Sequence, residues 1–200
     1  MAMAEDKITF LNSPGAEARL CEGLKAGDED CYRHLYGIFA PRLKRMLTRI
    51  WKDSQLSNDA VQSAFLIVFR CIDQFNGRSS LFTWITRIAL REAARLARRS
   101  KGQLDDAHFA TTPDAAPSPE EAYGTREQVD RLRALIDRLP VSKRTALILF
   151  EIEELSVNEI AEIMEEPRGT VLARLSRTRA ELREELRDLQ KPLEDQETIR

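Results

Sequence analysis

The chain is poor in the residues that enzymes use for catalysis. It has 2 histidines, His34 and His108, and 3 cysteines among 200 residues. It also has no glycine-rich phosphate loop and no grouping of cysteine with histidine that suits nucleophilic catalysis. These absences argue against an enzyme, so we expect neither catalytic residues nor a cofactor.

The cysteines, Cys21, Cys31 and Cys71, are odd in number and form no CxxC pair. Cys31 and His34 lie one helical turn apart, which is compatible with a metal pair or with a buried thiol beside a surface histidine. The second interpretation is favoured because no further ligands cluster nearby, and we expect no metal site. Cys71 lies in an apolar run typical of a core. The pattern suits a reducing cytoplasm and leaves a redox role for any of the three thiols open.

Long apolar runs are absent as well. No apolar run, the one at 146–150 included, is long enough to span a bilayer, and no signal peptide is visible at the N-terminus. We therefore expect a cytoplasmic protein without direct membrane insertion.

Charge is nearly balanced overall but unevenly distributed. Lys and Arg number 31 and Asp and Glu 33, so the net charge of -2 argues neither for nor against a nucleic-acid partner. Between residues 104 and 121 all charged residues are acidic, whereas the stretch 87–101 has Glu92 as its single acid. The basic residues of that stretch are Arg87, Arg91, Arg95, Arg98, Arg99 and Lys101.

Helical periodicity dominates most of the chain, and no segment shows the sustained two-residue alternation of a strand. The stretch 102–124 combines three prolines with small and acidic residues, a composition that cannot bury enough apolar surface to fold alone. The sequence therefore predicts an all-α protein with two small helical domains joined by a flexible acidic linker. The expected parts are a disordered arm (1–15), a first domain (16–101), the linker (102–125), a helix-turn-helix domain (126–190) and a tail (191–200).

Capping and spacing signals give the expected helices of the first domain. One covers about 17–26, and a second apolar series runs from Leu35 to Ile50, where Pro41 is expected to kink or divide it. Ser57 or Asn58 is expected to cap the next helix. A loop at 76–80 precedes a helix through Arg99. The expected buried face of the third helix is Val61, Ala64, Phe65, Val68, Phe69 and Ile72.

Two further helices are expected at about 125–138 and 140–152, and a helix pair follows them. Ser156 and Glu159 form a capping box at the start of its first helix, and Pro167 suits the start of its second. The second helix, expected to reach about residue 190, is cationic, which is the geometry that places a helix in the DNA major groove. A helical hairpin that merely packs is the other interpretation. The expected inward residues are Ile160, Ala161, Ile163, Met164, Val171, Leu175 and Leu182.

The basic helix of the first domain offers a second nucleic-acid surface. Arg87, Arg91, Arg95 and Arg98 share one face, where their charges repel unless an anion lies against them. Together with the upstream aromatic residues, this face could hold an unstacked single strand. The competing interpretations are a solvated face and, for at least one of the two aromatic residues of 81–84, a place in the core.

The order of these segments resembles a group IV, extracytoplasmic-function, bacterial sigma factor. The similarity covers about 28–186 and rests on LYGIFAPRLKRML, NDAVQSAF, FNGRSSLFTWITRIA and, after the linker, RLPVSKRTALILFEIEELSVNEIAEIMEEPRGTVLARLSRTRAEL. It implies a sigma-2 domain, a sigma-4 domain and no sigma-3 domain between them. It also implies a protein without a catalytic site that gives RNA polymerase its promoter preference, with promoter DNA and core polymerase as partners.

The resemblance assigns candidate residues to three surfaces. The surface for the β′ clamp helices of core polymerase comprises Asp59, Gln62, Ser63 and Phe65. The surface for the −10 element comprises Asn76, Arg78, Ser79, Ser80, Phe82, Trp84, Arg87, Arg91, Arg95, Arg98 and Arg99. The surface for the −35 element comprises Arg168, Thr170, Leu172, Ala173, Arg174, Ser176, Arg177 and Arg179.

Further partners follow from the resemblance alone. The apolar residues at 147–150 lie where sigma-4 domains seat the polymerase β flap, and an anti-sigma factor is the expected regulator. The acidic linker is expected either to occupy a cationic polymerase channel or to serve as a solubilising tether.

Some positions depart from the family pattern. Arg91 and Arg95 stand where members often have Asn and Asp, and Leu172-Ala173 stands where many have a basic residue and Ser. Leu and Ala cannot hydrogen-bond base edges, so Arg174 and Arg177 are expected to carry more of the reading, or the contacts are mostly to phosphate. A sigma-like decoy that binds an anti-sigma factor without promoter activity is therefore the competing hypothesis. The sequence leaves the inducing signal, the regulon and the promoter consensus open.

Overall fold

The computed structural model describes residues 15–102 and 123–189. Within these ranges every regular element is a helix, which confirms the all-α prediction. The expected arm (1–15), linker (102–125) and tail (191–200) lie wholly or largely outside the described residues. Among the described helices, none combines the length and apolarity needed to cross a membrane.

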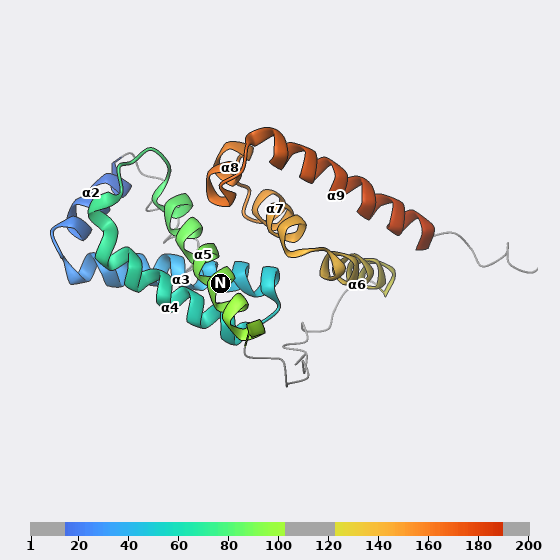
Figure 1. Ribbon diagram of the computed structural model, residues 1–200, viewed down its shortest axis with the longest axis horizontal. Helices are drawn as coiled ribbons and strands as arrows, with labels where there is room; N and C mark the ends of the chain where they lie inside the picture. Colours follow the sequence, from blue (N-terminus) through green and yellow to red (C-terminus); the bar gives the residue numbers. More distant parts are fainter. Residues whose placement is uncertain (1–14, 103–122, 190–200) are drawn as a thin grey trace, which may run out of the picture. The chain divides into compact units, whose positions relative to one another are not determined.

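The helices follow one another in chain order with short connections, apart from the gap before α6 (Figure 1). The elements are α2 (Ala16–Lys25), α3 (Glu29–Trp51), α4 (Ser54–Cys71), the 3-10 turn η1 (Ile72–Gln74), α5 (Leu81–Gly102), α6 (Tyr123–Arg138), α7 (Val141–Glu151), α8 (Val157–Met164) and α9 (Arg168–Leu189).

The chain divides into two compact units. Of the described residues, unit 1 comprises 15–102 and 158–166 and therefore includes α8 as well as α2 to α5. Unit 2 comprises the described residues of 123–157 and 167–189, which contain α6, α7 and α9. The predicted domain limits remain a prediction.

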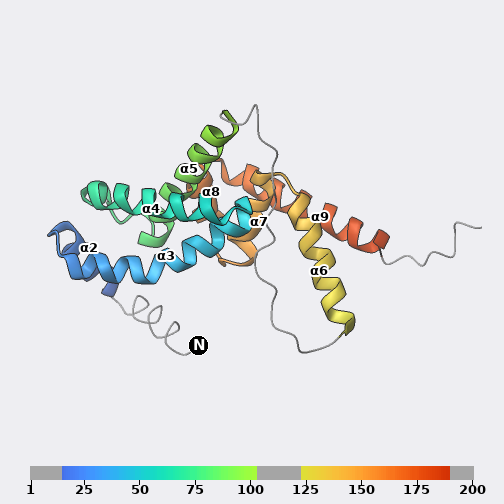
Figure 2. The same cartoon turned by 90° about the horizontal axis from the view of Figure 1, so that it is seen from below.

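Unit 1 is built on α3, α4 and α5, which pack against one another and lie side by side in both views (Figures 1 and 2). Their facing side chains form a dry core because apolar residues recur at helical spacing. Its fully buried members include Leu35, Leu43, Met46, Leu47, Ile50, Val68, Leu81 and Ile85.

Helix α3 runs through Pro41 as one helix, where the sequence predicted a kink or a division. Pro41 and Gly37, the residue four positions earlier, are both exposed. The missing proline N–H therefore leaves the Gly37 carbonyl on the solvent side, where water can hydrogen-bond it.

The start and the buried face of α4 differ from the prediction. Asp53, not Ser57 or Asn58, caps this helix: its carboxylate accepts from Leu56 N–H at 2.8 Å. An Asp cap satisfies the same orphan donors one turn earlier. Phe69, expected in the core, is 58% exposed, and Phe65 is only half-buried. Cys71 is also half-buried.

Unit 2 has its own small core between α6, α7 and α9. Leu135, Leu139, Leu147 and Leu182 form it, with Ile136 and Leu186 packed at its edge. The expected inward residues Val171 and Leu175 of α9 are buried as well, which confirms the apolar face of that helix. On α8, which belongs to unit 1, Ile160 and Ile163 are buried, whereas Ala161 and Met164 are half-buried.

Arg144 is a buried charged residue of unit 2 that was not predicted from the sequence. Its side chain, 7% exposed, donates hydrogen bonds to the carbonyl oxygens of Asp137 (2.7 Å) and Leu139 (2.8 Å). It thus satisfies carbonyls at the C-terminal end of α6, where a helix leaves acceptors without intrahelical partners. Desolvation lowers the pKa of Arg144, and the Asp137 carboxylate opposes that shift.

Candidate functional site

The loop before α5 is held by short hydrogen bonds. Asn76 Oδ1 accepts from the backbone N–H of Arg78 at 3.1 Å, and Gly77 has a φ of 72° that a side chain would strain. Ser80 Oγ accepts from Thr83 N–H at 3.0 Å, and Glu17 of α2 accepts from Leu81 N–H at 3.0 Å. The first turn of α5 and the loop before it are therefore fixed in place.

The two aromatic residues predicted at this helix start lie in the core. Phe82 is 7% exposed and packs on Phe39, with the Arg42 guanidinium 3.8 Å from its ring centroid. Trp84 is 8% exposed and packs on Phe75. The core interpretation therefore holds for both rings, because they support the helix and present no open stacking face in this structure. A direct base contact from either stays a prediction.

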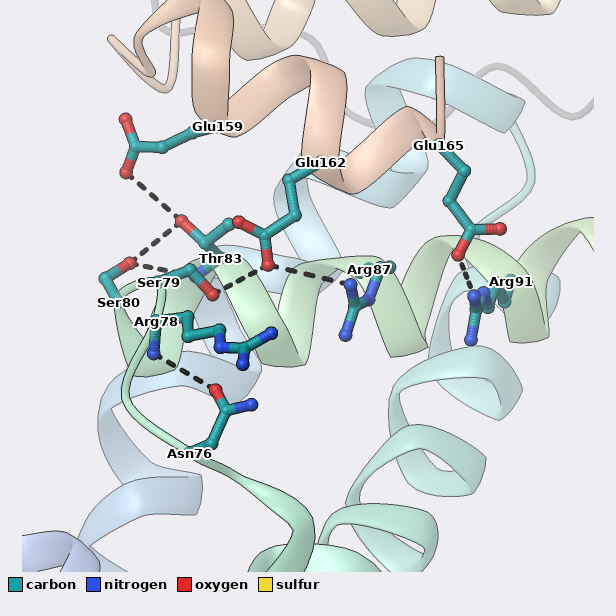
Figure 3. Close-up of polar contacts among 10 residues, drawn as sticks. All are labelled: Asn76, Arg78, Ser79, Ser80, Thr83, Arg87, Arg91, Glu159, Glu162 and Glu165. Carbon is teal, nitrogen blue, oxygen red and sulfur yellow. Dashed lines mark hydrogen bonds and ion pairs between the residues drawn. The ribbon is translucent and has the colours of Figure 1, made fainter. Parts of the chain in front are cut away.

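The basic face of α5 is lined by carboxylates. Glu92 and Arg95 pair within the helix, and the Glu92 carboxylate raises the pKa of Arg95. Two other arginines pair with α8: Arg87 with Glu162 at 3.6 Å and Arg91 with Glu165. Figure 3 shows the acidic side of α8 facing these residues and the loop before α5. Arg98 and Arg99, further along, are exposed.

A second surface of unit 1 runs along α4. Of the predicted residues, Asp59 and Gln62 are exposed, whereas Ser63 and Phe65 are half-buried, and the Phe65 ring contacts Tyr36 edge-on at 4.7 Å. Leu66 and Phe69 continue the exposed line at 60% and 58%. We call Asp59, Gln62, Leu66 and Phe69 the α4 stripe. Sequence analysis missed its last two members, although their spacing of three, four and three places all four on one helix face.

The predicted residues of α9 split between the surface and internal contacts. Arg168, Thr170, Ser176 and Arg177 are exposed, and Arg174 and Ala173 are half-buried. A shallow groove of about 510 Å³ beside them also involves Pro140, Ser142 and Lys143 of the α7 start. Leu172 is 42% exposed, so it is free to touch an apolar group such as a thymine methyl.

Arg179 differs from the other predicted α9 residues. Its guanidinium pairs with Glu151 at 2.5 Å and lies over the Phe150 ring at 4.7 Å from the centroid. This side chain therefore braces α9 against α7. At the expected flap seat, Leu147, Ile148 and Leu149 are buried and Phe150 is half-buried, so Phe150 is the member of 147–150 that reaches the surface.

Known protein families match both halves of the chain. A family model described as Sigma-70 region 2 matches residues 35–103, which span most of α3, α4 and α5. A second, described as Sigma-70, region 4, matches residues 130–182, which include α7, α8 and much of α9.

Curated relatives match nearly end to end. The RNA polymerase sigma-H factor of Pseudomonas aeruginosa is 32% identical over 183 residues, covering 86% of this chain and 95% of the relative. The ECF RNA polymerase sigma factor SigW of Bacillus subtilis is 31% identical over 176 residues, covering 83% and 94%. A solved structure of the sigma factor RpoE with the anti-sigma factor NepR from Bartonella quintana has the same fold. It is 21% identical with a TM-score of 0.63, covering 80% of this chain and 98% of that one. The chain belongs to the extracytoplasmic-function sigma factors of the sigma-70 family, which direct RNA polymerase to promoters.

Proposed function

We propose that unit 1 binds core polymerase through the α4 stripe and captures the opened −10 strand with α5. The observation that carries this proposal is that one compact unit presents both surfaces. The stripe places the apolar side chains of Leu66 and Phe69 in solvent next to polar Asp59 and Gln62, a mixture typical of protein interfaces. Because both surfaces lie on one unit, binding to polymerase also positions α5 for strand capture.

Strand capture by α5 requires a fixed loop and a cationic helix. The loop at 76–80 supplies the polar groups of Asn76, Ser79 and Ser80, and the arginines from Arg87 onward follow the strand's phosphates. Unstacking a base costs a few kcal/mol, offset by pocket and stacking contacts. Phe82 and Trp84 support this surface from below, since both are buried.

Duplex recognition belongs to α9. The exposed Arg168, Thr170 and Arg177, together with Arg174, suit contacts with the −35 element in the major groove. Leu172 and Ala173 limit base-edge hydrogen bonding, so we expect phosphate contacts to supply much of the affinity.

Control by an anti-sigma factor is part of the proposal. It is supported by the solved complex of RpoE with NepR, whose sigma subunit shares this fold. We expect such a regulator to cover polymerase-facing surfaces such as the α4 stripe, where Leu66 and Phe69 are exposed. The protein is expected to act in the cytoplasm, together with RNA polymerase.

Run-off transcription with purified core polymerase on a genomic promoter pool tests the proposal. We expect promoter-dependent products from the wild-type chain and none from Leu66→Ser/Phe69→Ser, which should no longer bind core polymerase in size-exclusion chromatography. Val129→Ser, which changes an exposed apolar residue of α6, is the matched control and should retain activity. A folded wild-type chain that yields no promoter-dependent product would favour the decoy hypothesis.

A further inference from the structure

Helix α2 borders the segment that leads into α5. It packs on η1 and α3, and its buried apolar residues include Ala16, Leu20 and Leu24 (Figure 1). None of the residues assigned to polymerase or to DNA lies on this helix. Its packing accounts for the apolar residues of α2 but leaves the charged ones without an assigned role.

Two charged side chains of α2 hold the two ends of the loop at 76–80. Lys25 Nζ donates to the carbonyl oxygen of Phe75 at 3.1 Å, directly before the loop. Glu17 Oε1 accepts from the backbone N–H of Leu81 at 3.0 Å, directly after it. We call Glu17 and Lys25 the α2 clamp. Because both contacts are to backbone atoms, the clamp constrains the path of the loop whatever side chains the loop carries.

The backbone groups that the clamp engages need a partner from elsewhere. Leu81 is the first residue of α5, so its N–H has no acceptor within that helix, and Phe75 follows the last residue of η1. Phe75 is 6% exposed and Leu81 is 0% exposed, so water has little access to them. A buried backbone group without a hydrogen bond costs free energy, which favours the formed clamp.

A role within α2 itself is the alternative interpretation of the two charges. Glu17 lies in the first turn of α2 and Lys25 in its last, and both signs suit the helix dipole. The dipole does not require either side chain to reach another segment. Yet the two contacts join residues 50 and 64 positions apart and engage opposite ends of the same loop. The geometry therefore favours a role in holding the loop.

A loop with fixed ends captures a strand at lower cost. The polar groups proposed to receive the unstacked base belong to Asn76, Ser79 and Ser80, which lie between the two clamped positions. The tip at 76–78 is exposed, so a ligand can reach it while the ends stay in place. A loop that is ordered before binding loses less conformational freedom on binding, and its affinity is higher for that reason.

We propose that α2 is a positioning element for strand capture, in which Glu17 and Lys25 set the conformation of the loop at 76–80 without touching DNA. The proposal rests on the proposed role of this loop in capturing the −10 strand. Binding to polymerase should not depend on the clamp, because the α4 stripe lies on a helix that packs against α3 and α5.

The first test measures strand binding by holoenzyme assembled from the full chain and core polymerase. The probe is the labelled single strand that wild-type holoenzyme enriches most from a random-sequence pool, followed by fluorescence anisotropy. We expect Glu17→Ala/Lys25→Met to bind it about tenfold more weakly than wild type, with core binding unchanged. Arg19→Met/Glu22→Ala removes the same charges at exposed positions of α2 and should stay within about twofold. Equal losses from the two double variants would overturn the proposal.

Single variants at Glu17 separate the reach of the side chain from its charge. Glu17→Asp keeps the charge in the first turn of α2 but is one methylene shorter, so it should lose Leu81 and weaken strand binding about fivefold. Glu17→Gln keeps the acceptor at the same reach without the charge and should stay within about twofold of wild type. The reverse order would assign the effect to the helix dipole and contradict the clamp.

Asp53→Ala controls for a general loss of stability in unit 1. It removes the cap of α4 and leaves both clamp residues in place. We expect lower stability of unit 1 in urea but strand binding within about twofold of wild type. A loss of strand binding as large as that of the double clamp variant would mean that stability, and not loop position, determines capture.

Amide hydrogen exchange of the free full chain separates this proposal from the proposed function. The Leu81 amide should exchange faster in Glu17→Asp than in wild type, whereas the Thr83 amide, bonded to Ser80, should change far less. Unchanged exchange at Leu81 overturns the clamp whatever happens with DNA. If exchange changes as expected but wild-type holoenzyme enriches no strand, the proposed strand capture is wrong and the contact between α2 and the loop stands.

Discussion

Helices α5 and α9 are both cationic, but their charges are in different situations. On α5, Arg87 and Arg91 pair with α8, and Arg95 pairs with Glu92 of its own helix. On the first turns of α9, Arg168 and Arg177 are exposed. Equal charge patterns in the sequence thus correspond to one occupied surface and one open surface.

The difference affects how each helix can bind DNA. A phosphate arriving at α9 displaces water and counterions, whereas one arriving at α5 must also displace carboxylates. Binding through α9 should therefore respond to salt in the ordinary way. Salt has two opposed effects on α5, because it weakens both the strand contact and the competing ion pairs.

The largest expected effect is a loss of stability in unit 2, the unit that contains α9. Arg144→Met removes hydrogen bonds to Asp137 and Leu139 and leaves buried carbonyls without donors. We expect the free energy of unfolding of unit 2 to fall by about 3 kcal/mol. Both tryptophans, Trp51 and Trp84, lie in unit 1, so urea unfolding should show an early circular-dichroism transition without a change in tryptophan fluorescence.

Arg138→Met is the control for this loss. Arg138 is exposed at the end of α6, and its removal should change stability by less than about 0.5 kcal/mol. Coincident fluorescence and circular-dichroism transitions in the Arg144 variant would mean that the two units unfold together.

The next effect comes from removing two arginines of α9 while leaving those of α5 unchanged. Arg174→Ala/Arg177→Ala should weaken holoenzyme binding to duplex promoter fragments by about 30-fold, since each good arginine contact contributes about 1–3 kcal/mol. Core-polymerase binding and single-strand binding should stay at wild-type levels. Arg187→Ala, on the last turn of α9, is the matched control. Loss of core binding in the double variant would contradict a role limited to DNA.

A smaller expected effect is a loss of stability in unit 1 when the cap of α4, the helix on which α5 packs, is removed. Asp53→Ala removes the carboxylate that caps α4 through Leu56 N–H, and we expect a loss of about 1 kcal/mol in unit 1. Tryptophan fluorescence during urea unfolding measures it. Gln55→Ala, at an exposed position in the first turn of the same helix, should change stability far less. An equal loss from both would assign the effect to helix propensity instead of the cap.

Much of the fold could be predicted because it depends on local signals. Helical periodicity and capping residues act over a few positions, so the existence and order of the helices followed from the sequence. The exceptions are equally local. The expected caps of α4, Ser57 and Asn58, were wrong because Asp53 caps the helix one turn earlier. The effect of the proline in α3 could not be predicted without knowing that its face is exposed.

The occupied state of α5 could not be predicted, because it depends on which distant segment packs there. Ser79 and Glu162 are 83 positions apart, and no spacing rule links them. The repulsion among the arginines did indicate an anionic partner, and phosphate was the expected one. The structure supplies carboxylates of the same chain. Buried Arg144 was missed for a similar reason, since its acceptors are backbone carbonyls that carry no sequence signal.

The smallest expected effect is a pH dependence of the stability of unit 1. Asp28 caps α3, accepting from Asp30 N–H at 2.8 Å and from Cys31 N–H at 3.4 Å, and these backbone hydrogen bonds lower the pKa of its carboxyl. A pKa lower in the folded than in the unfolded state contributes stability above the unfolded value of 3.8, and that contribution is lost as pH falls through the folded value. The difference in melting temperature between wild type and Asp28→Asn, followed by tryptophan fluorescence, should therefore be constant near neutral pH and shrink below about pH 4. A difference that persists unchanged into that acidic range would show that the cap acts through its shape alone, because asparagine accepts the same hydrogen bonds without the charge.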